Sequence, residues 1–291
     1  MTNRKKTLPL PKFYWSASRH WLWNDCQKCF CMKYIDKVPS FVDDYHFRYG
    51  RFFHEAIDNI VLGNGDKNPP SSDLIKVHEL KETHVVSYKK HIELFLDFQK
   101  KAGLKNSATE IEIRIELSCE NPFSKNGEKL LLYGFLDFVE FSEDTKEKPT
   151  IITIVLSDDG KYKTIGYDEN LKIIENFTIT KIFEFKTSTA SFSKNKINST
   201  PQFAWYSLFQ NLVNLNSNAK APLFSLVNFI KDKTNKNDRM QMLNLSFVDY
   251  EYISDEVSSI MKTLKSKEIS GISTCSYFSD YKTLCPTYTY L

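Results

Sequence analysis

Residues 181–188, which read K-I-F-E-F-K-T-S, constrain the fold of this chain more than any other stretch. Successive side chains of a β-strand point to opposite faces, so Glu184 and Lys186 would stand side by side while Phe183 and Phe185 anchor the other face in a core. In such a pair, the carboxylate can bind a metal ion while the neighbouring ammonium group binds a water or a charged oxygen. The alternative is an ordinary surface ion pair, which adds little stability.

Two further stretches predict strands that would accompany this one. Residues 109–118 alternate, with Ile and Leu at the odd positions of residues 111–117, so we expect these to face a core. The positions expected to face solvent are Glu110, Glu112, Arg114 and Glu116. Residues 130–141 contain Asp137 among apolar neighbours. A carboxylate in that company must be paired, hydrogen-bonded or metal-bound, unless the alternation turns it to solvent.

Helical patterns carry two other groups of polar residues. Residues 47–62 have an apolar stripe, and His54 follows Gly50 by one turn. A lone helical histidine is usually an ordinary half-buried or surface residue, so this spacing alone leaves a ligand role open. The Ser-Thr-Pro sequence at residues 199–201 predicts a helix start, after which Gln202 and Tyr206 share one face.

Composition and the position of polar segments indicate how the chain is organised. Hydrophobic residues make up 41% and charged residues 26%, typical of one soluble globular domain over residues 1–291, with a flexible arm at residues 1–12. Short strands in the polar residues 142–177 predict a β insertion before the strand that carries Glu184, and residues 269–291 form a cysteine-containing tail. No apolar run approaches the roughly 18 residues of a membrane span. We therefore expect a cytoplasmic protein without membrane contact.

The motifs in order are G-x-x-x-H on a helix, G-x-x-D on a hairpin, E-x-K on a strand and Q-x-x-x-Y on the following helix. Their residues are Gly50, His54, Gly134, Asp137, Glu184, Lys186, Gln202 and Tyr206. This arrangement resembles the RecB-type branch of the PD-(D/E)XK nuclease superfamily over residues 16–286. The resemblance implies an α/β fold, a central mixed sheet flanked by helices, and hydrolysis of DNA phosphodiester bonds.

The resemblance also implies a metal site. His54, Asp137, Glu184 and the backbone carbonyl of Phe185 would bind Mg²⁺ or Mn²⁺, ions that take oxygen ligands. Lys186 would orient a water or stabilise charge. The four side chains of His54, Asp137, Glu184 and Lys186 should therefore converge within a few ångströms.

Other residues would hold the substrate. By resemblance, Gln202 and Tyr206 would position the DNA strand and buttress the site. Lys194 and Lys196, in the loop after the E-x-K strand, would contact phosphates or belong to a solvated loop. The aromatic side chains of Trp21, Trp23 and Phe52 would either stack on bases or pack in the core. The net charge of +3 permits nucleic-acid binding without arguing for it.

The cysteines are similar to those of the iron–sulfur members of this branch, the CRISPR-associated exonucleases and the AddB-type nucleases. A Ser16-x-Ser18 motif leads into Cys26, and Phe30, Tyr34 and Cys285-Pro286 follow the family pattern. A [4Fe–4S] cluster needs four thiolates. Cys26, Cys275 and Cys285 match family positions, and the fourth ligand would be Cys29 or Cys31. Phe278 stands where a further cysteine is expected, so a remnant that packs the two ends together is the alternative.

Members of the RecB-type branch mostly work from DNA ends. We therefore expect an exonuclease that acts on single-stranded ends in recombination, repair or CRISPR-like processing. The alternatives are an endonuclease, an inactive nuclease-fold protein that binds DNA or a partner, and an unrelated protein of mixed fold. One departure from the family is that 46 residues separate Asp137 from Glu184, where a short turn is usual.

Overall fold

The computed structural model describes residues 8–39, 45–62, 79–80, 82–188, 191–193, 201–217, 219–230, 240–245, 251–269 and 285. The predicted phosphate contacts Lys194 and Lys196, and Cys275 with Phe278, lie outside the described residues. Within the described ranges, no helix combines the length and the apolar character needed to cross a membrane.

Eight strands form one mixed sheet, in the order β5-β4-β3-β1-β2-β6-β7-β8. The strands are β1 (Ser107–Glu120), β2 (Lys129–Phe141), β3 (Ile151–Leu156), β4 (Tyr162–Tyr167), β5 (Ile173–Ile174), β6 (Ile179–Ser188), β7 (Leu223–Ile230) and β8 (Met240–Leu245). The pairs β1–β3 and β6–β7 are parallel and the others antiparallel. The predicted α/β fold is confirmed: β1, β2 and β6 are central neighbours, and the insertion extends the sheet beyond β1.

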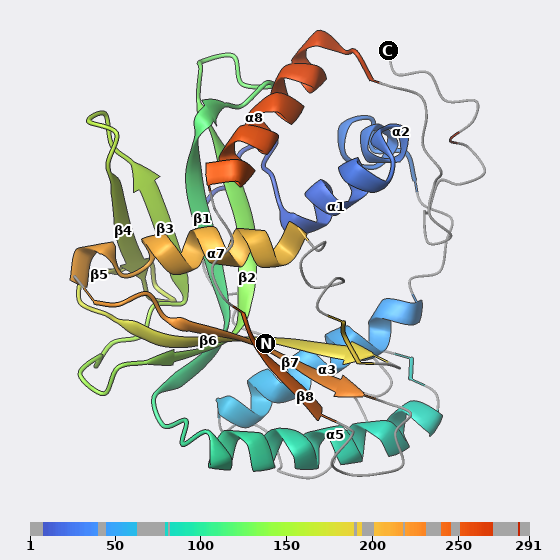
Figure 1. Ribbon diagram of the computed structural model, residues 1–291, viewed down its shortest axis with the longest axis vertical. Coiled ribbons are helices and arrows are strands. Elements are labelled where there is room, and N and C mark those ends of the chain that lie inside the picture. The colour runs from blue at the N-terminus through green and yellow to red at the C-terminus, as the bar shows by residue number, and fades with distance from the viewer. Residues whose placement is uncertain are drawn as a thin grey trace.

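Helices cover both faces of this sheet. They are α1 (Ala17–Asp25), α2 (Gln27–Phe30), α3 (Tyr45–Val61), α5 (Glu82–Lys101), α7 (Pro201–Leu212) and α8 (Glu251–Ser266), with a π-helical turn η1 (Cys31–Ile35) and a 3-10 turn η2 (Leu215–Ser217). Helices α3 and α5 lie together on one side, and α1, α7 and α8 lie on the other (Figure 1).

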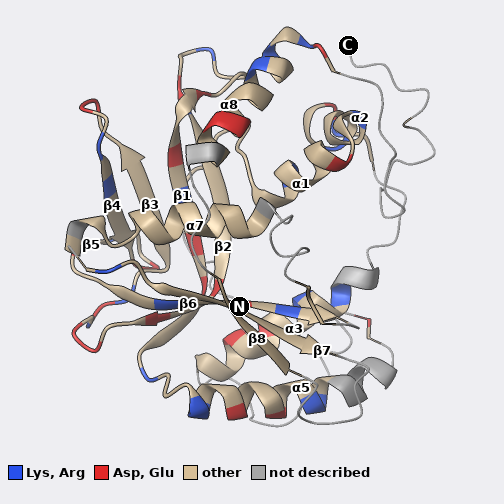
Figure 2. Cartoon of the chain, in the orientation of Figure 1, with Lys and Arg blue, Asp and Glu red and all other residues tan. Residues whose placement is uncertain are grey.

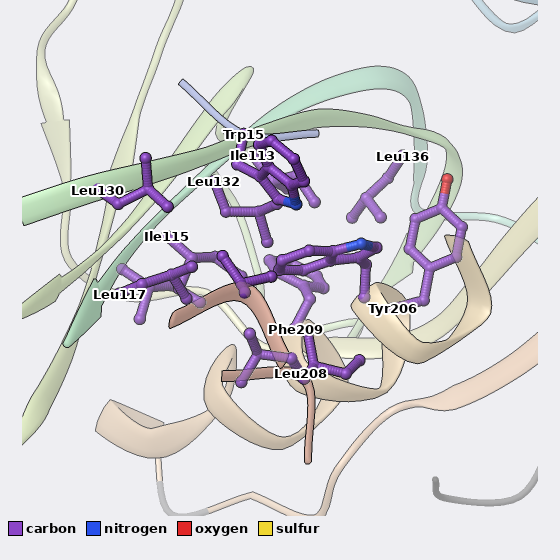
Figure 3. Packing of buried hydrophobic residues seen from close by; sticks show 14 of the residues in the cluster. Trp15, Ile113, Ile115, Leu117, Leu130, Leu132, Leu136, Tyr206, Leu208 and Phe209 are labelled. Carbon is purple, nitrogen blue, oxygen red and sulfur yellow. The ribbon is translucent and has the colours of Figure 1, made fainter. Parts of the chain in front are cut away.

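Each face of the sheet has its own core. On the α7 face, aliphatic side chains of β1 and β2 pack against Leu208 and Phe209, and Tyr206 lies at the edge with its hydroxyl pointing away (Figure 3). On the α3 face the core is aromatic and includes Phe183 and Phe185, as the alternation of β6 predicts. Trp23 and Phe52 are buried in these cores, which excludes them as base-stacking platforms, whereas Trp21 is 45% exposed.

The alternation of β1 and β2 is broken at one point in each strand. Ala108 and Ile111, three residues apart, both contact the α7-face core, and so do Leu136 and Val139. Glu110, in the first of these steps, has φ of 49°, in the left-handed region that costs an ordinary residue about 1–3 kcal/mol. Such irregularities re-aim side chains and are frequent beside functional sites.

The prediction that Glu112 and Arg114 face solvent is wrong. They are 5% and 4% exposed, because the chain near residues 8–9 covers this part of β1. The Nε of Arg114 donates to Glu112 Oε1 at 2.5 Å, and its other nitrogens donate to the carbonyls of Pro9 at 3.0 Å and Leu8 at 2.7 Å. A buried ion pair persists only when its remaining hydrogen-bonding groups are satisfied in this way.

Candidate active site

The imidazole of His54 lies between two carboxylates. Its Nδ1 is 3.4 Å from Asp137 Oδ1 and 3.4 Å from Glu110 Oε1. Ligand atoms of these three residues lie within 4.8 Å of one another, a spacing that one metal ion could bridge. Burial by itself would lower the pKa of His54, but the charges of Asp137 and Glu110 raise it to about 10. In the absence of a metal, the proton on His54 balances the two carboxylates.

Asp137 reaches this position because β2 and β6 separate beside it. The last pair on this side of the β2–β6 ladder is Phe138 with Phe183. The next backbone N–H of β6 that faces β2, that of Phe185, donates to Asp137 Oδ2 at 2.7 Å. Burial would raise the pKa of Asp137, but the neighbouring His54, Lys186 and this N–H together lower it. The carboxylate is thus held ionised where the sheet splits.

Glu184 is turned away from this group and towards α7. It is 1% exposed. Its Oε1 accepts from Gln202 Nε2 at 2.6 Å and from Lys186 Nζ, and its Oε2 accepts from the hydroxyl of Tyr206 at 2.6 Å. Burial and the charge of Asp137 raise the pKa of Glu184 to about 7, against the opposing effect of Lys186. A metal ion bound by Glu184 would have to share its carboxylate with these three donors.

A cavity of about 810 Å³ opens between α3 and the split in the sheet. Its lining residues are Gly50, Arg51, His54, Glu55, Asp58, Glu110, Asp137, Phe185, Lys186 and Thr187. The cavity therefore combines the His54 group with two cations, Arg51 and Lys186. This is the donor set that a divalent cation and a phosphate would both need.

The structure brings together most, but not all, of the predicted site. His54, Asp137, Phe185 and Lys186 share the cavity, while Glu184 joins them through Lys186 and is held by Gln202 and Tyr206. Glu110 was assigned to solvent by its alternation and instead stands opposite Asp137, because Thr109 pairs with Phe138 and Ile111 with Leu136. The register between the two strands would have placed Glu110 opposite Asp137. The sequence does not determine this register, because the connection at residues 121–128 is eight residues long.

The raised pKa of His54 makes a prediction for metal binding. In the folded protein His54 keeps its proton up to about pH 10, whereas in the unfolded chain it loses the proton above its ordinary pKa of 6.5. Protonation of His54 therefore stabilises the metal-free fold fully below pH 6.5, and this stabilisation is lost as the pH rises through about 10. A metal ion must displace the proton, so Mn²⁺ affinity should rise about tenfold per pH unit between pH 6.5 and 8. Titration calorimetry checks this. A pH-independent affinity, or an equally steep dependence in His54→Gln, would contradict it.

Three cysteines form a separate buried group beside α2. The ligand atoms of Cys26, Cys29 and Cys285 lie within 4.8 Å of one another, with the sulfurs of Cys26 and Cys285 3.4 Å apart. Cys26 also accepts the backbone N–H of Cys29, which fixes the turn into α2. Cys31 is outside this group, and burial raises the pKa of its thiol to about 12. Of the two residues predicted as a fourth thiolate, the structure therefore places Cys29 beside Cys26 and Cys285.

The spacing of these sulfurs bears on what they could hold. Tetrahedral thiolates around one Zn²⁺ lie about 3.8 Å apart, given a Zn–S bond of about 2.3 Å. In a [4Fe–4S] cluster each thiolate binds a different iron, which sets the sulfurs further apart. The cysteine group is thus compatible with a thiolate-bound metal, and its spacing is closer to that around a single ion.

No protein-family model and no curated protein matches the chain. Among solved structures, a protein from Eubacterium rectale named "Putative exonuclease" superposes with a TM-score of 0.51 at 9% identity, over 89% of this chain and 84% of that one. The structure of SSO0001 matches 84% of this chain and 96% of its own at 14% identity, but its TM-score of 0.35 is too low to support an argument. The first likeness shows that this chain shares the fold of that protein.

Proposed function

We propose that this protein is a metal-dependent DNA nuclease of the RecB-type branch of the PD-(D/E)XK superfamily, with residues 1–291 as one nuclease domain. The observation that carries the proposal is the meeting of His54, Glu110 and Asp137 on a cavity that Lys186 also lines. One nitrogen and two carboxylate oxygens suit Mn²⁺ or Mg²⁺. The combination of such a site with a nuclease-like fold favours phosphodiester hydrolysis over a purely structural role.

The residues of the site would divide the work between them. A bound Mg²⁺ or Mn²⁺ supplies a more acidic water and neutralises charge on the phosphoryl oxygen. Lys186, whose side chain is 32% exposed and lines the cavity, would hold the attacking water or the phosphoryl oxygen. Glu184 would hold the ammonium group of Lys186 through Oε1 and, as predicted, offer a carboxylate oxygen to the metal ion. The carbonyl of Phe185 remains the predicted backbone ligand.

Gln202 and Tyr206 act on the reaction through Glu184. Both donate to its carboxylate, and Tyr206 also lies 3.3 Å from the carbonyl oxygen of Phe135. They would therefore position Glu184 relative to Lys186 and keep it available when a metal ion draws it towards the cavity. We propose these two as positioning residues.

We propose that the substrate is DNA with single-stranded ends. Helix α3 covers the site, with Gly50, Arg51 and His54 on the cavity wall, so a strand would have to pass beneath it. Lys and Arg residues are spread over α3, α5, α8 and β4 and are mixed with Asp and Glu (Figure 2). Such a surface favours local contacts over long-range attraction of a duplex. The exonuclease name of the Eubacterium rectale protein agrees with this proposal.

Linear and circular DNA separate the proposed exonuclease from an endonuclease. We expect linear single-stranded DNA to be degraded at least about tenfold faster than the same sequence closed into a circle, because only a free end can be threaded beneath α3. The assay uses Mn²⁺ or Mg²⁺, with a chelator as control, and follows product on a gel. Equal rates on both substrates indicate an endonuclease, and no cleavage with either metal would contradict the proposed function.

We also propose that Cys26, Cys29 and Cys285 bind a metal, as the corresponding cysteines of the resembled nucleases bind a [4Fe–4S] cluster. Protein purified without oxygen should contain either iron with acid-labile sulfide or one zinc ion, and Cys29→Ser should release it and lower the melting temperature. The reason is that a thiolate-bound metal joins Cys285 to the N-terminal helices and so stabilises the folded state. Metal analysis and absorbance check this, with Cys31→Ser as the control. Protein that binds neither metal would contradict it.

A further inference from the structure

Phe135 is an exposed aromatic residue beside the candidate active site. It is 43% exposed and precedes Asp137 by two residues on β2, which places their Cα atoms about 7 Å apart. Its ring contacts that of Tyr133, with centroids 5.4 Å apart at 82°. Tyr133 in turn lies 5.1 Å from Tyr14, whose ring lies 3.9 Å from the guanidinium of Arg19. Phe135 is therefore the solvent-facing end of a row of packed planar groups.

The row lies on the face of the sheet to which the cavity opens. Leu132 and Leu136 belong to the α7-face core, so Tyr133 and Phe135 between them point to the opposite face. That opposite face is the one that α3 covers, and α3 contributes half of the cavity wall. Phe135 thus borders the approach to the site.

The position of Phe135 is fixed by its backbone. It pairs with Glu112 of β1, and its carbonyl lies within hydrogen-bond distance of the hydroxyl of Tyr206, which also binds Glu184. The ring of Phe135 is 43% exposed and belongs to neither core. A planar group that enters the site could therefore stack on it.

We propose that Phe135 stacks on an unpaired base of the nucleic acid whose phosphate enters the cavity, with Tyr133 and Tyr14 supporting its ring. The inference rests on the proposed function and adds to it a residue that contacts the bases of the single strand. Bases in a duplex are already stacked and cannot cover Phe135, whereas every unpaired base has a free face. Exposed aromatics on a sheet bind single-stranded nucleic acid in this way in other folds. Arg51 and Lys186, on the cavity wall, would take the adjacent phosphate.

Binding measured without catalysis tests the inference. In a chelator, fluorescence anisotropy of a labelled single-stranded oligonucleotide gives Kd for wild type, Phe135→Ala, Phe135→Trp and a control, Phe123→Ala. Phe123 is also 43% exposed but lies in the connection between β1 and β2, at the far end of the hairpin. We expect Phe135→Ala to weaken binding about 5- to 150-fold, and Phe135→Trp and Phe123→Ala to bind within about twofold of wild type.

An oligonucleotide with abasic sites distinguishes stacking from other contacts. Wild type and Phe135→Ala should bind it with the same affinity, because only the phosphate contacts remain. Wild-type affinity of Phe135→Ala for the normal strand, an equal loss on the abasic strand, or no binding of single strands by wild type would overturn the inference. Cleavage of linear DNA by wild type is assayed separately with Mn²⁺. Absent cleavage refutes the proposed function, whereas normal cleavage with no effect of Phe135→Ala on binding refutes only the stacking.

Discussion

Replacement of Asp137 by asparagine is expected to lower metal-dependent cleavage by at least about 1,000-fold, because loss of the metal removes several kcal/mol of transition-state stabilisation. The carboxylate of Asp137 lies 3.4 Å from His54 Nδ1 and accepts the backbone N–H of Phe185. The amide oxygen of asparagine can still accept the N–H of Phe185, so the split in the sheet should survive. Cleavage rates measure the loss of activity, and Mn²⁺ calorimetry measures the loss of metal binding.

The matched control for this variant is Asp144→Asn, an exposed carboxylate in the connection between β2 and β3. It removes the same charge from the same residue type outside the site, and its activity should stay within about twofold of wild type. Circular dichroism and the melting temperature verify that both variants are folded. An Asp137→Asn protein that binds Mn²⁺ and cleaves at the wild-type rate would refute the assignment of the site.

Lys186→Met should separate catalysis from metal binding. Lys186 lines the cavity but lies outside the His54 group, so Mn²⁺ affinity should change by no more than a few-fold. The rate should fall about 100- to 1,000-fold, the usual effect of removing one group that stabilises transition-state charge. Without Lys186 the pKa of Glu184 rises further, so this carboxyl group stays neutral and the fold avoids an unpaired buried charge. Single-turnover cleavage at saturating Mn²⁺ measures the rate.

Lys163→Met is the control for Lys186→Met, since Lys163 is an exposed lysine on another strand of the same sheet, β4. It should cleave like wild type. Two results would contradict the role assigned to Lys186. One is a rate within about tenfold of wild type, and the other is a loss of Mn²⁺ binding as large as that of Asp137→Asn.

The local sequence determined which elements form and which of them carry the functional side chains. The period of two in residues 181–188 predicted both the strand β6 and the burial of Phe183 and Phe185. The apolar stripe of residues 47–62 predicted the helix that carries His54, and the Ser-Thr-Pro sequence predicted the start of α7. These features depend on residues close in the chain, since periodicity and capping act over one or two turns or a few strand positions.

Only the tertiary structure decided how these side chains meet. The left-handed backbone at Glu110 and the separation of β2 from β6 beside Asp137 bring these two carboxylates to His54, and no sequence periodicity predicts either feature. The three donors around Glu184 come from β6 and α7, so its orientation depends on how the helix packs on the sheet. Cys29 joins Cys26 and Cys285 although Cys31 was as plausible by spacing. Each of these outcomes depends on strand register and helix packing between distant segments, which local sequence patterns do not encode.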